Sequence, residues 1–246
     1  RDLHTAYRRQ RQMCIRDRIK HGASVLAIGA DVYQPCEYLY GENDKVLTHL
    51  ELGEEIAKGE ESIIQAESLV MIQCVGCRNE ERNYCSRVCC SHAIKNALKL
   101  KELNPEMSIY ILFRDMRTYG LKEDFYRDAA EKGVTFIRYE IDDKPVVEAV
   151  KAGGKSILRV TVTDPVLGKK LELDADVVSL AAAVIPAATT HEIARMFKVT
   201  LSPDDFFKEA HVKLRPVEFS ADGVYLCGTA HYPKPVSYKH LRAHET

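Results

Sequence analysis

The sequence predicts an α/β protein built on a doubly wound parallel sheet, and three observations support this prediction. Apolar runs of strand length alternate with amphipathic stretches of helix length between residues 68 and 139. The first of these runs, 68–73, is apolar without interruption from residue 69 to residue 72, which is typical of a strand buried on both faces of a parallel sheet. The turn after the first of these strands holds cysteines, where a nucleotide-binding unit carries a Gly-rich phosphate loop.

Composition and charge limit the classes of function. The chain has 246 residues with 46% hydrophobic content, enough to bury a core in one or two domains. A formal net charge of -1 gives no attraction toward nucleic acid or an anionic membrane surface. No apolar run reaches the roughly 18 residues of a spanning helix, and no secretory signal precedes the fold. We therefore expect a soluble cytoplasmic protein without a membrane span.

Both ends of the chain differ in character from the rest. Residues 1–20 and 237–246 resemble translated sequencing-adapter read-through, so we interpret them as artefacts and expect no function for Cys14. The alternative is a basic arm that binds nucleic acid. No aromatic stacking platform accompanies the arginines, so we do not favour it.

The first elements are a strand, a helix and a second strand. The apolar run 24–30 contains a glycine near its end, which predicts a buried strand whose backbone then turns close to another group. Residues 48–51 read Thr-His-Leu-Glu, a capping box that predicts a helix to about residue 58 with a glycine after it. The run 68–73 predicts a buried strand that leads directly into Cys74.

The next elements complete the alternating unit. A helix is expected to continue from Cys90 to about Lys101, because the apolar residues there follow a helical period and Pro105 lies beyond them. Further elements are expected at 108–113 (strand), 122–132 (helix) and 134–139 (strand). Elements in this order form a parallel unit in which a ligand sits at the carboxyl ends of the strands.

The last third begins with an antiparallel pair. The runs 157–163 and 170–173, joined by a turn with Asp-Pro, predict a β-hairpin, and a strand and a helix are expected at 176–183 and 191–198. The segment 221–231 combines an Asp-Gly turn, a short apolar strand and a glycine. Such a backbone can approach a phosphate or a flavin closely.

The stretch from residue 74 to residue 90 is where we place the chemistry. It holds five of the eight cysteines, namely Cys74, Cys77, Cys85, Cys89 and Cys90. Thiols this dense, in a chain of cytoplasmic character, more often ligate metal than form disulfides. Outside the stretch, Cys36 and Cys227 are expected to be buried fillers.

The spacing favours an iron-sulfur cubane over a zinc ion, which usually takes two separate Cys-x2-Cys pairs. Cys85 and Cys89 are four residues apart and can share a helical face, whereas the adjacent Cys90 diverges from them. Diverging thiolates suit the separate irons of a cubane, so we predict a 4Fe-4S cluster with Cys74 or Cys77 as fourth ligand. Two alternatives stay open: a thioredoxin-like redox pair of Cys74 and Cys77, or a non-enzymatic zinc-binding module.

The charged residues near the cysteines have two interpretations. Arg78, Arg82 and Arg87 are either solvated surface residues or cations that offset the charge of a cluster and raise its reduction potential. Lys95 is either an exposed lysine of the following helix or a cation that faces the edge of a flavin.

Four segments carry a resemblance to a known family. They read Ile-Gln-Cys-Val-Gly at 72–76, Tyr-Cys-Ser-Arg-Val-Cys-Cys at 84–90, Ile-Leu-Phe-Arg-Asp-Met-Arg-Thr-Tyr-Gly at 111–120 and Glu-Ala-His-Val-Lys-Leu-Arg-Pro-Val at 209–217. Here the chain resembles the A-type iron-sulfur flavoprotein subunit of CoB-CoM heterodisulfide reductase and its bacterial relatives. The resemblance covers nearly everything between the two unusual ends, and the chain looks like an internal segment of a longer subunit.

The resemblance implies a thioredoxin-reductase-like fold of the FAD/NAD(P) type, with the cysteine turn in place of the Gly-rich loop. It implies an oxidoreductase that carries FAD and 4Fe-4S clusters and that relays, or bifurcates, electrons in methanogenesis. The expected partners are the other iron-sulfur subunits of such a complex and electron donors of the hydrogenase or formate dehydrogenase type.

The same resemblance implies domains and flavin contacts. Residues 21–66 and 176–236 are expected to form the flavin-binding domain, 67–150 a Rossmann-like half-domain with the cluster, and 151–175 a hairpin. The flavin contacts are expected mainly from backbone groups of Gly29, Ala30, Gly228, Thr229 and Ala230. The Gly-x-Gly-x-x-Gly fingerprint is not in the sequence, so we expect the intact subunit to hold FAD tightly and this chain alone not to.

The resemblance also assigns the cluster ligands, to Cys74, Cys85, Cys89 and Cys90. Position 77 is usually serine in the family pattern, so the cysteine there makes the fourth ligand ambiguous. We favour Cys74 because it ends a strand and should be fixed in direction by the sheet. Cys77 follows Gly76 in what we expect to be the looser part of the turn.

Overall fold

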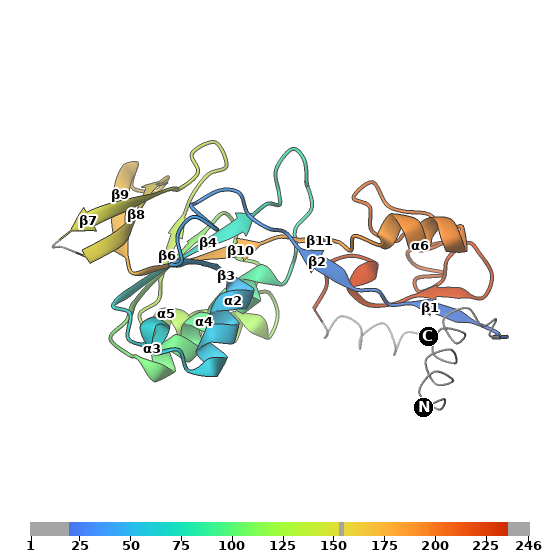
Figure 1. The fold of residues 1–246 in the computed structure, drawn as a ribbon, viewed down its shortest axis with the longest axis horizontal. Helices are drawn as coiled ribbons and strands as arrows, with labels where there is room; N and C mark the ends of the chain where they lie inside the picture. The colour runs from blue at the N-terminus through green and yellow to red at the C-terminus, as the bar shows by residue number, and fades with distance from the viewer. Residues whose placement is uncertain (1–19, 153–154, 236–246) are drawn as a thin grey trace, which may run out of the picture.

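The structure is a computed structural model that describes residues 20–152 and 155–235. These residues form two lobes joined by a narrow two-stranded ribbon (Figure 1). The two end segments that we interpret as artefacts, with Cys14, lie outside the described residues except for Lys20. Among the described helices, none has the length and apolar character needed to cross a bilayer.

The larger lobe is built on a five-stranded parallel sheet with the strand order β3-β10-β4-β5-β6. Its strands are β3 (Val46–Thr48), β4 (Ser68–Val75), β5 (Ser108–Phe113), β6 (Thr135–Arg138) and β10 (Val177–Ala182). The alternating parallel unit predicted between residues 68 and 139 is confirmed as β4-α4-β5-α5-β6.

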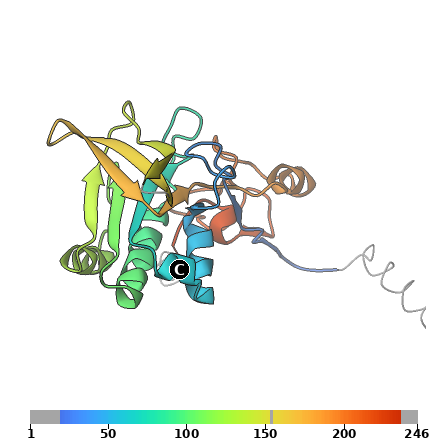
Figure 2. The same cartoon turned by 60° about the vertical axis from the view of Figure 1, so that its left-hand side comes forward.

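Helices cover one face of this sheet, and a three-stranded antiparallel sheet covers the other (Figure 2). The helices are α2 (His49–Lys58), α3 (Glu61–Ile64), α4 (Cys89–Leu103) and α5 (Lys122–Glu131). The antiparallel strands are β7 (Val146–Ala152), β8 (Lys155–Asp164) and β9 (Lys169–Ala175). The predicted hairpin is confirmed as β8 and β9, but β7 was missed because charged residues interrupt its apolar positions.

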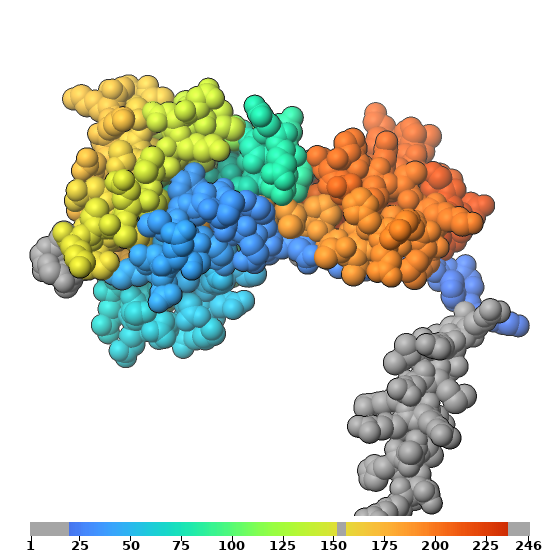
Figure 3. All heavy atoms as spheres, turned by 45° about the horizontal axis from the view of Figure 1, so that its top comes forward, coloured from blue at the N-terminus to red at the C-terminus, as the bar shows by residue number. Residues whose placement is uncertain are grey.

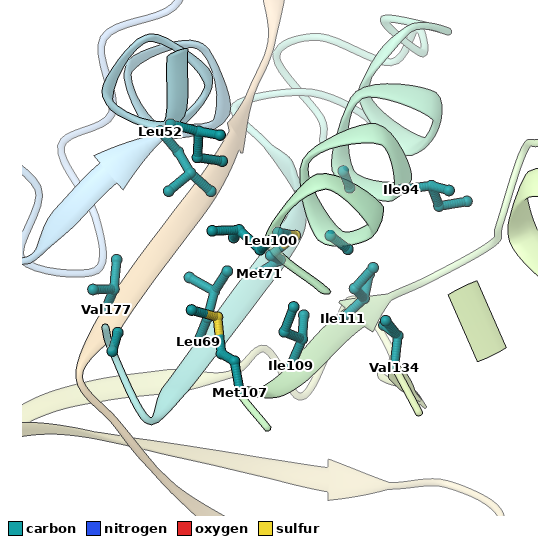
Figure 4. Close-up of a cluster of buried hydrophobic side chains, with 14 of the residues drawn as sticks. Leu52, Leu69, Met71, Ile94, Leu100, Met107, Ile109, Ile111, Val134 and Val177 are labelled. Atoms are coloured by element: carbon teal, nitrogen blue, oxygen red, sulfur yellow. The ribbon is translucent and has the colours of Figure 1, made fainter. Parts of the chain in front are cut away.

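The core explains why β4 is apolar without interruption. Leu69 and Met71 pack against the helices, in the cluster shown in Figure 4. Val70 and Ile72 point the other way and pack against the three-stranded sheet. All four side chains are at most 1% exposed. Each burial of this kind stabilises the fold by about 1.5–3 kcal/mol, so the central strand supports both layers at once.

The predicted start and end of α2 are confirmed in detail. Thr48 and Glu51 form the capping box, with the Thr48 Oγ1 accepting from the Glu51 backbone N–H and the Glu51 carboxylate accepting from the Thr48 backbone N–H. Gly59 closes the helix in the left-handed conformation, at a φ of 79°.

The smaller lobe contains β1 (Ser24–Leu26), β12 (Val224–Leu226), α6 (Thr190–Phe197) and the 3-10 helix η1 (Gly228–Ala230). The connecting ribbon pairs β2 (Ala30–Val32) with β11 (Val184–Pro186) in antiparallel orientation. The chain thus crosses from the smaller lobe to the larger one along β2 and returns along β11 (Figure 1).

Two segments that we expected in the flavin-binding domain contribute strands to the larger lobe. β3 and α2 belong to the larger lobe, because β3 pairs with β10 and β10 pairs with the central strand β4. The hairpin unit also begins earlier than residue 151, since β7 starts at Val146. Contiguous segments of sequence did not reveal that β3 and β10, which are remote in the sequence, pair in the same sheet as β4.

Candidate metal centre

The cysteines gather where β4 gives way to α4. Cys74 lies near the end of β4, Cys89 and Cys90 begin α4, and Cys77 and Cys85 lie between them in the segment 76–88, which we call the cysteine loop. Figure 3 shows the loop, in teal-green, between the two lobes. The site thus lies at the carboxyl end of the sheet, where parallel α/β folds bind ligands.

Cys74 lies in a bulge and not in a regular strand. The register of β4 against β10 skips between Ile72 and Val75, and Cys74 has a φ of 63°. This left-handed conformation costs a non-glycine residue about 1–2 kcal/mol, so surrounding contacts must hold it. Cys74 lies at the end of a strand as expected, but a bulge and not regular pairing with the sheet sets its direction.

Two hydrogen bonds attach the cysteine loop to the ribbon strand β11. The Ser86 Oγ accepts a hydrogen bond from the Val184 backbone N–H at 2.9 Å, and the Ser86 side chain is fully buried. The Tyr84 Oη donates to the Val184 carbonyl oxygen at 2.9 Å. Polar groups that occupy an otherwise open strand edge give the loop one fixed position.

Gly76 allows the loop to meet the other strand of the ribbon. A Cβ atom at this position would lie 2.2 Å from the ring of Tyr33, the residue after β2. Gly76 also has a φ of 76°, which favours glycine. The Arg82 guanidinium lies over the same ring, 4.8 Å from its centroid. The loop therefore packs against both strands that connect the lobes.

The residues that follow β5 also contact the cysteine loop and Cys90. The Arg114 Nη1 donates to the Arg78 carbonyl oxygen at 2.7 Å, and the Arg78 side chain forms an ion pair with Asp115. The Cys90 Sγ lies 3.8 Å from the Asp115 carbonyl oxygen. In a dinucleotide-binding fold this region faces the ribose, whereas here it contacts the cysteine loop.

The structure brings the thiols close enough together to shift one another's pKa values. The Cys77 thiol donates a hydrogen bond to Cys74 and lowers the pKa of Cys74 to about 6, and the Arg78 charge acts in the same direction. The pKa of Cys77 is raised, by that hydrogen bond and by burial. Burial and the charges of Cys90 and its neighbours raise the pKa of Cys89 to about 12. Removing the protons from all these thiols is therefore unfavourable without a compensating cation.

Two premises about the cysteines are wrong. Cys77 is not loosely held, because it is only 3% exposed and contacts Cys74 and Ser86. Cys85 does not share a helical face with Cys89, because α4 begins at Cys89 and Cys85 lies in the loop. The segment around Ser86 is not helical, because the Ser86 Oγ accepts a hydrogen bond from β11 and Arg87 has a φ of 60°. The two cysteines outside this group, Cys36 and Cys227, were expected to be buried fillers of the core, but both are exposed.

The arginines do not act as one group. The Arg78 Nη1 lies 3.8 Å from the Cys74 Sγ. Arg82 stacks on Tyr33, and the Arg87 guanidinium lies 4.8 Å from the centroid of the Tyr232 ring. Arg87 still contributes through its backbone N–H, which donates to the Cys85 Sγ at 3.3 Å.

Further contacts near the thiols come from residues that sequence reasoning missed. The Arg114 charge acts on Cys74, and the backbone and charge of Arg117 act on Cys90. Ser86 was also missed, although its place between two cysteines was a usable signal. The contact made by Tyr33 had no signal in the sequence, because it depends on the path of the ribbon.

The free thiols of this site are a donor set that an iron-sulfur cluster can use. Within residues 20–152 and 155–235, no three His, Cys, Asp or Glu side chains converge as ligands of one ion do. The cysteines around this site are all free thiols. Thiolates that bind separate irons of a cubane need not converge on one point. N–H groups and cations directed at sulfur are the contacts that stabilise such clusters.

The segments expected to bind flavin meet in the smaller lobe. β1 and β12 pair in parallel with Leu26 opposite Leu226, so the segments with Gly29 and Gly228 leave the same edge. Both glycines have left-handed φ values, of 79° and 78°, and a Cβ atom on Gly29 would meet nothing within 4 Å. Ala30 begins β2, whereas Thr229 and Ala230 lie in η1 rather than in a longer helix. The open space at Gly29 fits a ligand approached by backbone groups there, whereas Gly228 and Ala230 are buried.

Lys95 is not brought to that edge. It is exposed on α4 and lines a groove with Lys122 and Phe125 of α5. It therefore faces the helix layer of the larger lobe, as the surface interpretation predicted.

Comparison with known proteins supports the resemblance. The chain is 37% identical over 237 residues to the A-type iron-sulfur subunit of the CoB-CoM heterodisulfide reductase of Methanocaldococcus jannaschii, with 89% of this chain and 35% of that protein covered. It is 36% identical over 257 residues to the A-type subunit of the ferredoxin:CoB-CoM heterodisulfide reductase of Methanosarcina acetivorans, with 88% and 31% covered. The chain is thus related to the A-type subunit of heterodisulfide reductase and spans about a third of the length of these curated relatives. No family model matches the chain.

Solved structures confirm the predicted fold class. Thioredoxin reductases of T. acidophilum and Lactococcus lactis each match with a TM-score of 0.53, at 13% and 16% identity. The matches cover 86% and 87% of this chain and 58% and 59% of those chains. The fold is therefore thioredoxin-reductase-like, with the cysteine loop after β4 of the parallel sheet.

The packing of Gly76 on Tyr33 can be tested with a matched pair of variants. Gly76→Ala and Gly168→Ala both place alanine at a left-handed φ, which costs about 1 kcal/mol. Only at Gly76 does the new Cβ atom meet a ring, so we expect about 1–3 kcal/mol of additional destabilisation. Urea denaturation of both variants measures the difference. Equal losses would show that the ring does not confine the loop.

Proposed function

We propose that this chain is the part of a heterodisulfide-reductase-type subunit that holds a 4Fe-4S cluster and passes electrons between that cluster and a flavin. The observation that carries the proposal is the gathering of free thiols in the cysteine loop, between the lobe with the parallel sheet and the lobe with Gly29 and Gly228. The relationship to A-type iron-sulfur subunits supports it.

The proposed ligands are Cys74, Cys85, Cys89 and Cys90. A bound cluster would supply one-electron chemistry at this position. The chain's own groups then act on the ligand sulfurs: the Arg78 guanidinium near Cys74 offsets negative charge, and the Arg87 N–H donates to Cys85. Both contacts favour the more negative, reduced state and so raise the reduction potential.

Cys77 has a separate role in this proposal. Its thiol donates a hydrogen bond to Cys74 and lies buried beside Ser86. A donor at this position stabilises a thiolate at Cys74 without ligating iron itself. Serine, the usual residue here in the family pattern, can donate in the same way.

The proposed flavin is FAD, held along the edge formed by Gly29, Ala30 and the segment 228–230. The left-handed glycines and the open space above Gly29 let a ligand approach the backbone. Partners are proposed to be other iron-sulfur subunits and a hydrogenase-type or formate-dehydrogenase-type donor. The names of related subunits, which include ferredoxin and H(2)/formate, motivate this choice.

A second candidate function is thiol-disulfide exchange by Cys74 and Cys77. The hydrogen bond between the two thiols and the pKa of Cys74 near 6 favour it, because a thiolate beside a protonated thiol is the usual attacking arrangement. It leaves Cys85, Cys89 and Cys90 without a role.

The visible spectrum and metal content of the anaerobically purified chain separate the candidates. The proposal predicts iron, acid-labile sulfide and a broad visible band that bleaches on reduction. Zinc without colour would point to a binding module. A colourless, metal-free protein with a reducible disulfide would replace the cluster with thiol-disulfide exchange.

Substitution of the two candidate fourth ligands tests the assignment. Cys74→Ser is expected to lose most of the iron and sulfide, because a hydroxyl is a far poorer iron ligand than a thiolate. Cys77→Ser is expected to keep both, since the new hydroxyl preserves the hydrogen bond to Cys74. Iron and sulfide per chain are the measurement. The reverse pattern would make Cys77 the ligand.

Flavin retention tests how much of the FAD site the chain contains. Because the Gly-x-Gly-x-x-Gly fingerprint is missing from the sequence, we expect FAD added to this chain to separate from it during gel filtration. The longer subunit should retain it under the same conditions. Stoichiometric FAD that co-elutes with this chain would contradict the prediction.

A further inference from the structure

A chain of polar side chains crosses the core of the larger lobe beneath the cysteines. The Gln73 Nε2 lies 2.9 Å from the His49 Nε2, and the His49 Nδ1 lies 2.7 Å from the Ser179 Oγ. The Asn96 Nδ2 donates to the His49 carbonyl oxygen at 2.9 Å. These four residues are at most 4% exposed. Burying so many polar groups costs free energy that an apolar core would not, so their arrangement calls for a reason.

The polar chain connects the two elements that carry candidate ligands. Gln73 directly precedes Cys74 in the bulge at the end of β4. Asn96 lies on α4, which begins with Cys89 and Cys90. His49, the first residue of α2, bonds to Gln73 through its ring and to Asn96 through its carbonyl. One residue thus links the strand end and the helix.

A further bond fixes the backbone next to Cys74. The Tyr139 Oη donates to the Gln73 carbonyl oxygen at 2.6 Å, and Tyr139 is only 3% exposed. Gln73 is therefore held through both its side chain and its backbone, immediately before a residue with a left-handed φ. The strained backbone of Cys74 persists only if contacts on the adjacent residues hold it, and these contacts on Gln73 do so.

The His49 ring is suited to a fixed connection. Burial, and then the nearby His92, lower its pKa to about 3, so the ring stays neutral at physiological pH. A neutral ring accepts a hydrogen bond at one nitrogen and donates at the other. With Gln73 donating to Nε2, the Nδ1–H group donates to Ser179, and this pattern does not change between pH 5 and 8.

We propose that His49 is a positioning residue for the cluster site: through Gln73 and Asn96 it sets the separation between Cys74 and the Cys89-Cys90 pair. A cubane tolerates little change in the spacing of its thiolates, so the spacing needs a rigid support. Paired polar contacts specify one arrangement more strictly than apolar packing does. The inference rests on the proposed cluster and goes beyond it by naming the residue that holds the two ligand-bearing elements.

The test compares variants of the full chain with a control of equal stability. His49→Leu removes the two contacts of the ring, with Gln73 and with Ser179. Asn96→Leu removes only the hydrogen bond from α4 to the His49 carbonyl oxygen. The controls are Leu158→Ala and Val160→Ala, buried in the layer on the other face of the sheet; the one whose melting temperature matches each variant is used. His49→Gln keeps polar groups near both partners and serves as the conservative variant.

The readouts are the rate of iron loss to a chelator and the EPR spectrum of the reduced protein, both taken well below the melting temperatures. We expect iron loss about 10-fold faster in His49→Leu and Asn96→Leu than in the matched control, with an altered EPR line shape and partial recovery in His49→Gln. If His49→Leu does not fold, Asn96→Leu alone decides the outcome.

Equal iron loss and equal spectra in the variants and the matched control would overturn the inference and leave the cluster itself established. A wild-type protein without iron would overturn the proposed function, and the positioning role with it. The two failures are therefore distinct.

Discussion

The crowding of buried thiols is the constraint on which the rest of the site depends. Burial, and then the negative charges of neighbouring thiols, raise the pKa of Cys89 and Cys90, whereas the hydrogen bond to Cys74, and then burial, raise the pKa of Cys77. Only Cys74 is shifted the other way, by the Cys77 hydrogen bond and by Arg78. A bound cationic iron core would remove the conflict, because it would replace several protons and let the proposed ligands be thiolates.

The fold meets this constraint by using surfaces that a dinucleotide-binding protein already has. The cysteine loop takes the place of the phosphate loop after β4, and the segment after β5 contacts the loop where a ribose would lie. The ribbon between the lobes contacts the cysteine loop as well, through Val184 and Tyr33. An electron carrier at this position would face both lobes, which is what a relay between a cluster and a flavin requires.

The sequence was sufficient for elements whose signals are local. The capping box of α2 and the uninterrupted apolar run of β4 each predicted what the structure contains. It was insufficient where remote segments meet. The pairing of β3 with β10 places β3 in the larger lobe. The bulge at Cys74 depends on the register of β4 with β10. The burial of Cys77 depends on Ser86 and the ribbon. Periodicity cannot report such contacts.

The most direct test of the central claim is a crystal structure of the anaerobically reconstituted chain with anomalous diffraction at the iron edge. We predict four iron positions bounded by the sulfurs of Cys74, Cys85, Cys89 and Cys90, with the Cys77 sulfur hydrogen-bonded to Cys74 and bound to no iron. A single metal position, or iron bound to Cys77 in place of Cys74, would contradict the account.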